Sequence, residues 1–300
     1  MTANIGNHVE AYGHRGARFE LPENTLAGFE YTISLGADGF EFDLNITKDN
    51  VIVISHDQVL HGPICKGPAE YAVIHESTLQ QLKMWDCGGV NPELSRQKAV
   101  PGERIPTLDE IFALAPRGDF RFLLEAKSAT RRLTEEEARQ ILRQETRTEL
   151  TKEQEDKQIH IMMLSGPELT PPPDEYAQMI LDKIREYHLE KRVCLLAIDY
   201  QILYSMRRLA PEIQIIATYS PRSNMSMMDV IKMAGPDVVL PVGIMVTAEE
   251  VLAAHKEGVK VIAGGNRPAV WESHIAAGVD GIASDAPSAL IEFLKSKGLR

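Results

Sequence analysis

Short runs of aliphatic and β-branched residues alternate along most of the chain with longer segments in which apolar positions recur at helical spacing. Eight such runs begin at residues 9, 39, 120, 193, 213, 237, 259 and 279. Segments between them, such as DEYAQMILDKIREYH and TAEEVLAAHKEG, have the period of amphipathic helices. Near-continuous apolar strands that alternate with helices are typical of a parallel sheet covered by helices.

Eight strand–helix units predict an α/β fold, a single (β/α)8 barrel of the TIM type, which takes about 250 residues. A doubly wound open sheet is the alternative architecture. The turn after the first predicted strand has no GxGxxG fingerprint, which disfavours a dinucleotide-binding sheet of that kind. We therefore expect residues 1–300 to form one barrel domain.

Two long excursions depart from this alternation. Residues 57–106 are rich in Gly, Pro and Cys and have no clear period, so we expect a loop-rich segment over one end of the barrel. Residues 128–172 are strongly charged and helix-prone, which predicts an insertion of one or two surface helices. Its IHIMML stretch is compatible with an extra strand or the edge of a small subdomain. The proline run 171–173 predicts the start of the next helix.

Composition and charge limit the class of partner. The chain is 44% hydrophobic and 25% charged, which is ordinary for a globular protein. Its formal net charge is -11 and no basic stripe is present, so we expect no nucleic-acid partner. A small anionic substrate would need local cations from Arg, Lys or a metal ion. For the assembly we expect a monomer or a small homo-oligomer.

The cysteines and the termini bear on the compartment. Cys65, Cys87 and Cys194 have no regular spacing, which predicts reduced packing residues rather than a disulfide framework or a zinc site. The N-terminus has neither a basic n-region nor an apolar h-region, and no stretch approaches the ~18 apolar residues of a membrane span. We expect no membrane span and a cytoplasmic protein, or a secreted or periplasmic one after removal of a signal peptide.

Carboxylates gather on the second predicted strand. Strand alternation places Glu41 and Asp43 on one face, where they repel each other unless a cation lies between them. The turn signal that follows predicts a hairpin with a two-residue tip at Asp49-Asn50. That tip would place Asp43 opposite His56. The alternative for this stretch is a solvent-exposed hairpin with ordinary polar residues.

Other ionisable residues end the neighbouring strands. The third predicted strand, FRFLLEAK, ends with Glu125 and Lys127 on one face. The first strand ends with His14 and Arg15. Because the carboxyl ends of barrel strands share the face where active sites form, we expect these groups to converge.

Together these residue types match the parts of a phosphoester site. Three carboxylates can hold a hard divalent cation such as Mg²⁺ or Ca²⁺ through oxygen ligands. Two cationic side chains can bind a phosphate beside the metal, and two histidines can act as general base and acid. The candidate metal ligands are Glu41, Asp43 and Glu125, the candidate substrate-binding residues are Arg15 and Lys127, and the candidate acid and base are His14 and His56.

Several stretches, in order, resemble a known family. HRG followed by PENT, and then GADGFEFDLNITKDNVIVISHD, is similar to the N-terminal signature of the glycerophosphodiester phosphodiesterases. IPTLDEIFAL, LEAKS and AAGVDGIASDAP resemble later landmarks of the same family. The resemblance implies a TIM-type barrel that uses a divalent metal to hydrolyse a small phosphodiester, such as a glycerophosphodiester, to an alcohol and glycerol 3-phosphate. It also implies the roles given above for the seven candidate residues.

Two landmarks of that family are missing. Ile198-Asp199-Tyr200 stands where the family usually has a Ser-Phe pair, and AGGNRP stands where it usually has Trp-Thr. Loss of a large aromatic side chain at a barrel mouth enlarges the pocket. Natural loop expansion and deliberate remodelling of a barrel both account for these departures and for the charged insertion. The alternative function is a remodelled or inactive barrel that binds a phosphoester or another small ligand.

Overall fold

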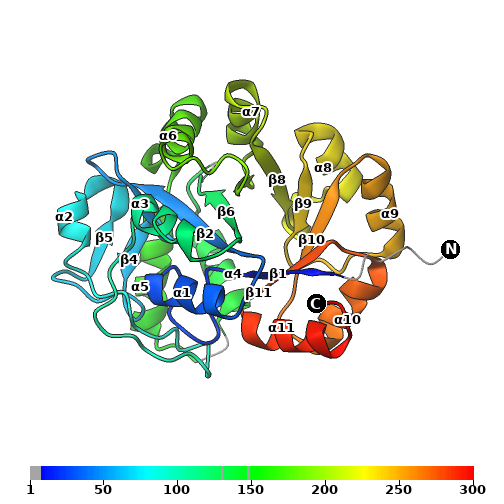
Figure 1. Cartoon of the computed structure of the whole chain (residues 1–300). Coiled ribbons are helices and arrows are strands. Elements are labelled where there is room, and N and C mark those ends of the chain that lie inside the picture. The colour runs from blue at the N-terminus through cyan, green and yellow to red at the C-terminus, as the bar shows by residue number, and fades with distance from the viewer. Residues whose placement is uncertain (1–7, 130, 147–148) are drawn as a thin grey trace.

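A closed barrel of eight parallel strands forms the centre of the molecule. The computed structural model describes residues 8–129, 131–146 and 149–300. Its strands follow the order β1-β11-β10-β9-β8-β7-β6-β2, and β1 pairs with β2 to close the ring (Figure 1). The predicted TIM-type barrel is confirmed, and the open sheet is excluded. The strands are β1 (Glu10–Gly13), β2 (Gly39–Ile46), β6 (Arg121–Ala126), β7 (Val193–Ala197), β8 (Gln214–Tyr219), β9 (Val238–Pro241), β10 (Lys260–Gly264) and β11 (Gly281–Ser284).

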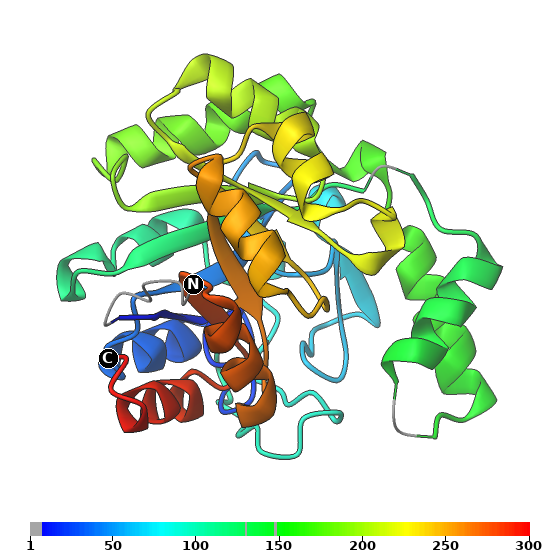
Figure 2. The same ribbon diagram turned by 90° about the vertical axis from the view of Figure 1, so that its right-hand side faces the viewer.

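Helices surround this barrel (Figures 1 and 2). Many begin at a residue that suits a helix start: Thr25 and Thr107 accept N–H groups of the first turn, and α10 and α11 begin with proline. The covering helices are α1 (Leu26–Ser34), α3 (Leu108–Phe112), α6 (Pro173–Glu186), α7 (Tyr200–Leu209), α8 (Met227–Ala234), α9 (Ala248–Lys256), α10 (Pro268–Ala277) and α11 (Pro287–Ser296). Short 3₁₀ helices are η1 (Ile74–Glu76), η2 (Ala115–Arg117), η3 (Pro167–Leu169) and η4 (Pro221–Ser223).

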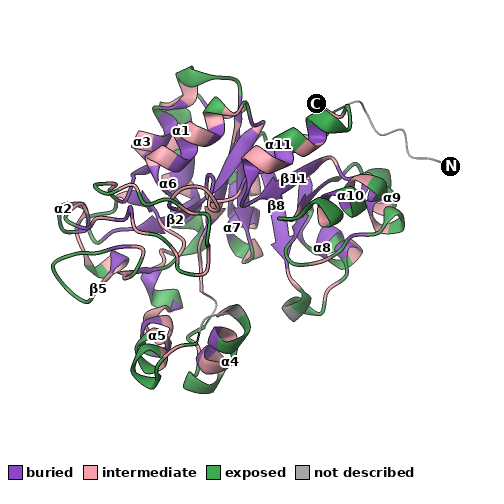
Figure 3. Ribbon diagram, turned by 90° about the horizontal axis from the view of Figure 1, so that it is seen from below, coloured by how far each residue is buried: buried purple, intermediate pink, exposed green. Residues whose placement is uncertain are grey.

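Strand alternation divides the core into two layers. On β2, Phe40 and Phe42 belong to the layer between sheet and helices, where Phe40 stacks on Phe29 of α1 with ring centroids 4.8 Å apart. The intervening positions, Glu41 and Asp43, lie on the other face of the strand. Alternate residues of the other strands fill the barrel, and Figure 3 shows these strands as buried. The buried interior residues are Tyr12, Leu123, Cys194, Leu196, Ile216, Val238, Leu240, Ile262 and Ala283.

The two excursions pack against each other beside the barrel. The first contains the hairpin β4 (Val59–His61) and β5 (Tyr71–Val73), and α2 (Leu79–Leu82), whereas β3 (Ile52–Ile54) precedes it and pairs antiparallel with β2. The second contains α4 (Glu135–Glu145) and α5 (Lys152–Leu164), which stand to one side of the barrel in Figures 2 and 3. A small apolar cluster joins them; it consists of Val59, Val73, Ile161 and Leu169. No helix in the described part of the chain is long and apolar enough to cross a bilayer.

The possibility of a strand at IHIMML is wrong, because this stretch forms the end of α5. Ile159 packs against Leu142 of α4, whereas Ile161 packs against the β4–β5 hairpin. The helix therefore has two apolar sides, which makes its sequence look like an apolar strand. A short apolar run does not distinguish the two structures by periodicity alone.

The predicted register of the hairpin that follows β2 is also wrong by one residue. The N–H of Thr47 donates to the carbonyl of Val51 at 3.0 Å, so three residues form the tip, and the last of them has a left-handed φ of 60°. Asp43 consequently lies opposite Ser55, whose N–H donates to its carbonyl at 3.0 Å, and not opposite His56. A three-residue loop with a left-handed last residue is a common hairpin connection, and it is one residue longer than the predicted tip.

Cys65 and Cys87 form a disulfide, so the prediction that the cysteines are reduced is wrong for this pair. Between them, the backbones of Lys66 and Asp86 exchange two hydrogen bonds of 2.7 and 2.8 Å, which bring the adjacent cysteines together. This pairing lies in the loop-rich excursion, where no periodic pattern of apolar residues predicts it. Cys194 is free and buried, as predicted.

Candidate active site

Three carboxylates converge at the mouth of the barrel, the face where the carboxyl ends of the eight strands lie. Glu41 and Asp43 come from β2 and Glu125 from the adjacent β6, where Asp43 and Glu125 are register partners. Each side chain offers one oxygen, and these oxygens lie within 4.8 Å of one another. The structure therefore brings together the three residues that the sequence suggested as metal ligands.

The carboxylates fit a hard divalent cation. Oε1 of Glu41 is buried and accepts no hydrogen bond. Burial, followed by the charges of Asp43 and Glu125, raises the pKa of Glu41 well above its usual value. A buried acceptor without a donor is costly, and a cation between the oxygens would remove that cost. Mg²⁺ and Ca²⁺ both prefer such oxygen ligands.

Lys127 holds two of the carboxylates. Its Nζ lies 3.0 Å from Oδ1 of Asp43 and 2.8 Å from Oε1 of Glu125. Burial lowers the pKa of Lys127, but the charges of these two carboxylates raise it by more, so that the pKa lies above its usual value. Burial alone would raise the pKa of Asp43. The positive charges around this carboxylate, of which Lys127 has the largest effect, hold its pKa well below the usual value. The ammonium group is thus a fixed positive charge beside the candidate metal position.

The HRG turn places Arg15 against the same carboxylates. Its backbone N–H donates to Oε2 of Glu41 at 3.0 Å, and its Nη1 donates to Glu23 at 2.8 Å. Arg15 has a left-handed φ of 50°, and a Cβ on Gly13 would lie 2.1 Å from the carbonyl oxygen of Gly16. Only glycine permits this close approach, so the glycines on both sides of the His-Arg pair allow the sharp turn.

His14 is held by a carboxylate from the far end of the chain. Its Nδ1 lies 2.5 Å from Oδ1 of Asp285, and its Nε2 lies 3.8 Å from Oε2 of Glu41. Asp285 follows β11 and is held by Asn266. The Nδ2 of Asn266 donates to Oδ2 of Asp285 at 2.7 Å, and its Oδ1 accepts from the backbone N–H of Asp285 at 2.8 Å. Burial raises the pKa of Asp285, but the bond from His14 leads the effects that lower it below the usual value. The carboxylate therefore fixes the imidazole, with Nε2 facing the cluster.

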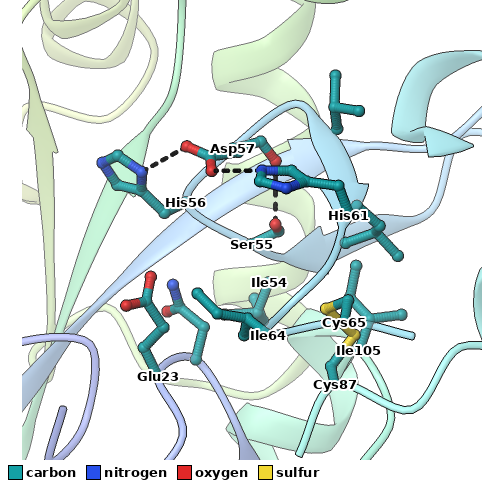
Figure 4. A pocket seen from close by; sticks show the side chains of 13 residues that line it. Glu23, Ile54, Ser55, His56, Asp57, His61, Ile64, Cys65, Cys87 and Ile105 are labelled. Atoms are coloured by element: carbon teal, nitrogen blue, oxygen red, sulfur yellow. Dashed lines mark hydrogen bonds and ion pairs between the residues drawn. A yellow bond between two sulfur atoms is a disulfide. The ribbon is translucent and has the colours of Figure 1, made fainter. Parts of the chain in front are cut away.

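His56 is oriented in the same way, on the other side of the mouth. Its Nδ1 lies 2.8 Å from Oδ1 of Asp57, and the other oxygen of Asp57 lies 3.7 Å from Nε2 of His61 (Figure 4). The Nδ1 of His61 donates to the carbonyl of Gly62 at 2.7 Å, since a carbonyl only accepts. Figure 4 also shows Glu23 on the side of His56. In the described part of the chain, His56 forms no ion pair with the three carboxylates, although its charge lowers the pKa of Asp43.

The ionisable groups were predictable from the sequence, but the side chains that orient them were not. Asn24 donates to Oδ2 of Asp43 at 2.8 Å, while Asp57 and Asp285 each hold a histidine. Each lies inside a stretch that carried the family resemblance: Asn24 in PENT, Asp57 in SHD and Asp285 in ASDAP. The signal that points to Asp285 is its place directly after a barrel strand.

Comparison with known proteins agrees with this geometry. The sequence model of the glycerophosphoryl diester phosphodiesterase family matches residues 14–170 and 144–289. A glycerophosphodiester phosphodiesterase from Caldanaerobacter subterraneus subsp. tengcongensis is 27% identical over 286 residues, which cover 95% of this chain and 97% of that one. A crystal structure from Silicibacter pomeroyi DSS-3 has a TM-score of 0.78 and 26% identity, covering 97% of this chain and 95% of that one.

A third protein supports the fold alone. It is a phosphodiesterase from Oleispira antarctica, solved with the product sn-glycerol-3-phosphate, with a TM-score of 0.70 and 19% identity over 95% of this chain and 96% of that one. The family match begins at His14 and extends past Asp285, so it spans the strand ends that build the site. The chain therefore belongs to the glycerophosphoryl diester phosphodiesterase family of phosphoric diester hydrolases.

Proposed function

We propose that this protein cleaves a glycerophosphodiester to an alcohol and glycerol 3-phosphate, with Mg²⁺ or Ca²⁺ held by Glu41, Asp43 and Glu125. The observation that carries the proposal is the cluster of three carboxylates whose oxygens lie within 4.8 Å of one another, with Oε1 of Glu41 buried and without a hydrogen-bond donor. When bound, the cation would offset the negative charge of the phosphoryl oxygens. The name of the relative that is 27% identical over 95% of this chain, a glycerophosphodiester phosphodiesterase, supports the same substrate class.

Arg15 and Lys127 bind the phosphate from the protein side. Both are cationic at any physiological pH, because the surrounding carboxylates raise their pKa values even though burial opposes this. They supply the local positive charge that an anionic substrate needs in a chain of net charge -11.

His14 and His56 move the protons. One imidazole takes a proton from the nucleophile, a water molecule or a neighbouring hydroxyl of the substrate, as the new P–O bond forms. The other, as imidazolium, gives a proton to the leaving alkoxide as its P–O bond breaks. Asp285 and Asp57 each bind Nδ1, so Nε2 is the atom that exchanges the proton in both histidines.

Hydrolysis of glycerophosphocholine tests the proposal. EDTA should abolish turnover, and added Mg²⁺ or Ca²⁺ should restore it. His14→Ala and His56→Ala should each lower kcat by roughly 10²–10⁴. His255→Ala is a matched control, because His255 also pairs with a carboxylate, that of Asp280 at 2.9 Å, but lies on α9.

Full turnover after exhaustive chelation would rule out the metal-dependent reaction. A wild-type kcat in either histidine variant, with a native circular dichroism spectrum, would remove that histidine from the mechanism. Binding of glycerophosphocholine without turnover would favour the alternative, a barrel that binds phosphoesters.

The disulfide bears on the compartment. Disulfides persist mainly in oxidising environments outside the cytoplasm, so we infer that the protein works in such a compartment and that the cytoplasmic alternative is disfavoured. Labelling of free thiols in protein taken directly from its native source would test this. One reactive thiol per chain after unfolding is expected, and three would contradict the inference.

A further inference from the structure

The turn between β3 and β4 fixes the backbone of Asp57 but not its side chain. The Nδ2 of Asn45 donates to the backbone carbonyls of Ser55 and Asp57 at 2.7 and 3.4 Å, and Oγ of Ser55 donates to the carbonyl of Asp57 at 2.9 Å. The Asp57 side chain is 56% exposed, so packing does not fix its carboxylate. Among the described residues, only the side chains of His56 and His61 pair with that carboxylate.

His61 is better fixed than the carboxylate that it faces. Its side chain is 21% exposed, and it lies on β4 opposite Tyr71 of β5. Its Nδ1 donates to the carbonyl of Gly62 at 2.7 Å, which holds the ring and leaves Nε2 directed toward Asp57 (Figure 4). The imidazole is therefore a fixed group on the side of Asp57 away from His56.

The hydrogen bond to Gly62 makes the contact with Asp57 dependent on protonation. Because that bond uses the proton on Nδ1, a neutral His61 presents the lone pair of Nε2 to a carboxylate oxygen 3.7 Å away. Two acceptors do not attract each other. A second proton converts Nε2 to a donor and gives the ring a positive charge, so only the imidazolium can hold Asp57.

The groups beside His61 favour that imidazolium. Burial lowers the pKa of His61, but the hydrogen bond and the charge of Asp57, together with the carbonyl of Gly62, raise it above its usual value. The imidazolium therefore predominates at pH ~6.5 and below, and it is lost as the pH rises through the raised pKa.

The helix α5 brings one opposing charge to this ring. Lys157 lowers the pKa of His61, although Glu70 binds the Nζ of Lys157 at 2.9 Å and offsets part of its charge. The other titratable rings on α5 and β5, those of His160 and Tyr71, contact each other with centroids 5.9 Å apart. Asp57 therefore remains the dominant partner of His61.

The position of Asp57 in turn decides the orientation of His56. Its Oδ1 lies 2.8 Å from Nδ1 of His56, which leaves Nε2 to exchange the proton in the proposed reaction. If the half-exposed carboxylate turned toward solvent, His56 would lose the group that fixes its ring. Misplacement of a catalytic group by about 1 Å can lower turnover roughly 10²-fold.

We propose that His61 is a positioning residue of the reaction, whose imidazolium holds Asp57 in the conformation that binds Nδ1 of His56. This rests on the role given to His56 in the proposed function. His61 takes no part in bond formation or proton transfer, and it acts on the reaction only through Asp57 and His56.

His61→Leu tests the proposal, because leucine fills a similar volume without Nε2 or a charge. With glycerophosphocholine, kcat of this variant should be roughly tenfold below that of the wild type at pH 6 and within about twofold of it at pH 9, with KM unchanged at both. His75→Leu is the matched control. Nδ1 of His75 also donates to a carbonyl, that of Ile46 at 3.2 Å, but His75 forms no ion pair with a carboxylate of the described residues, so kcat should not change.

An equal loss at pH 6 and pH 9 would show that His61 acts through packing and not through its charge, which would overturn the proposal. A wild-type kcat of His61→Leu at pH 6 would overturn it too. Both outcomes leave the hydrolase proposal intact, because they require turnover by the wild type.

NMR of histidine-labelled wild type needs neither turnover nor a folded variant. The imidazole nitrogen signals of His56 should show an additional step at the pH where the signals of His61 titrate, because both rings share Asp57. If no substrate is turned over, this step supports the positioning role while the proposed hydrolysis fails. Signals of His56 that do not respond to the titration of His61 overturn the positioning role.

Discussion

Lys127→Met tests how the buried carboxylates are stabilised. Methionine keeps the apolar stem of lysine but removes the ammonium group, which lies 3.0 Å from Asp43 and 2.8 Å from Glu125. The carboxylate side chains are 1% and 14% exposed, so water replaces the lost charge poorly. Removal of one partner from a buried ion pair costs about 3–5 kcal/mol of unfolding free energy.

The lower end of that range is expected. Asp43 keeps the amide of Asn24 at 2.8 Å and the guanidinium of Arg15 at 3.6 Å, so it is not left without a partner. We therefore predict a loss of ~3 kcal/mol for Lys127→Met. In a chain of 300 residues this corresponds to a fall in Tm of about 5 °C.

Denaturant and thermal unfolding in EDTA would measure this loss. Lys297→Met is the matched control, because Lys297 pairs with Glu272 at 2.7 Å but the two side chains are 44% and 64% exposed. Such a surface pair contributes at most ~1 kcal/mol. If Lys127→Met is no less stable than Lys297→Met, the ammonium group does not stabilise the carboxylates as the distances indicate.

Mg²⁺ provides a second measurement on the same variants. A ligand at 100 times its Kd stabilises a folded protein by ~2.7 kcal/mol. Without the competing ammonium of Lys127, the cation should bind Asp43 and Glu125 more tightly, so its stabilisation of Lys127→Met should exceed that of the wild type. A smaller gain in the variant would refute the idea that the ammonium and the cation compete for the same oxygens.

Three further predictions concern stability. Glu41→Gln should stabilise the chelated protein at pH 7 by ~0.5–2 kcal/mol in urea unfolding, because a neutral amide avoids the cost of a carboxyl group that burial and two neighbouring carboxylates disfavour in its charged form. The same change should abolish stabilisation by Mg²⁺, and a loss of stability in EDTA would count against the reasoning. Burial lowers the pKa of His61, but the hydrogen bond and charge of Asp57 raise it above its usual value. The contribution of the His61–Asp57 pair to folding stability is therefore complete below pH ~6.5 and is lost as the pH rises through the raised pKa. Because Asp57 is 56% exposed, His61→Gln should cost at most ~1 kcal/mol at pH 5.5 and less at pH 8.5, and a cost that grows with pH would contradict this. Reduction of the Cys65–Cys87 disulfide, which spans 22 residues, should cost about 3 kcal/mol in thermal unfolding, and an unchanged Tm would show that the bridge adds nothing.

The barrel was predictable because the apolar runs, the helical periodicity between them and the number of strand–helix units all indicate the same fold. Eight apolar strand runs alternate with helical segments, so the count of strand–helix units predicts the barrel even where the bounds of one element are wrong. The polar ends of β1, β2 and β6 could be placed together because the carboxyl ends of parallel strands share one face. The convergence of Glu41, Asp43 and Glu125 follows from that rule alone.

The details that failed depend on contacts that no local pattern encodes. The register of the hairpin was wrong because one extra residue in the tip shifts every partner. The bond from His14 to Asp285 joins residues 271 positions apart, and the disulfide depends on the pairing of Lys66 with Asp86 in an irregular loop.

The contact between the two excursions has a consequence for how this protein can diverge or be recombined. Gln58, next to Asp57, donates to Oγ1 of Thr170 at 3.1 Å and accepts from the N–H of Gly166 at 3.1 Å. A chimera that exchanges the second excursion, residues 128–172, alone would remove Ile161 and Leu169 from Val59 and both partners from the Gln58 amide, directly beside the carboxylate that orients His56. The hairpin and residues 128–172 should therefore be inherited, or transplanted between barrels, as one module.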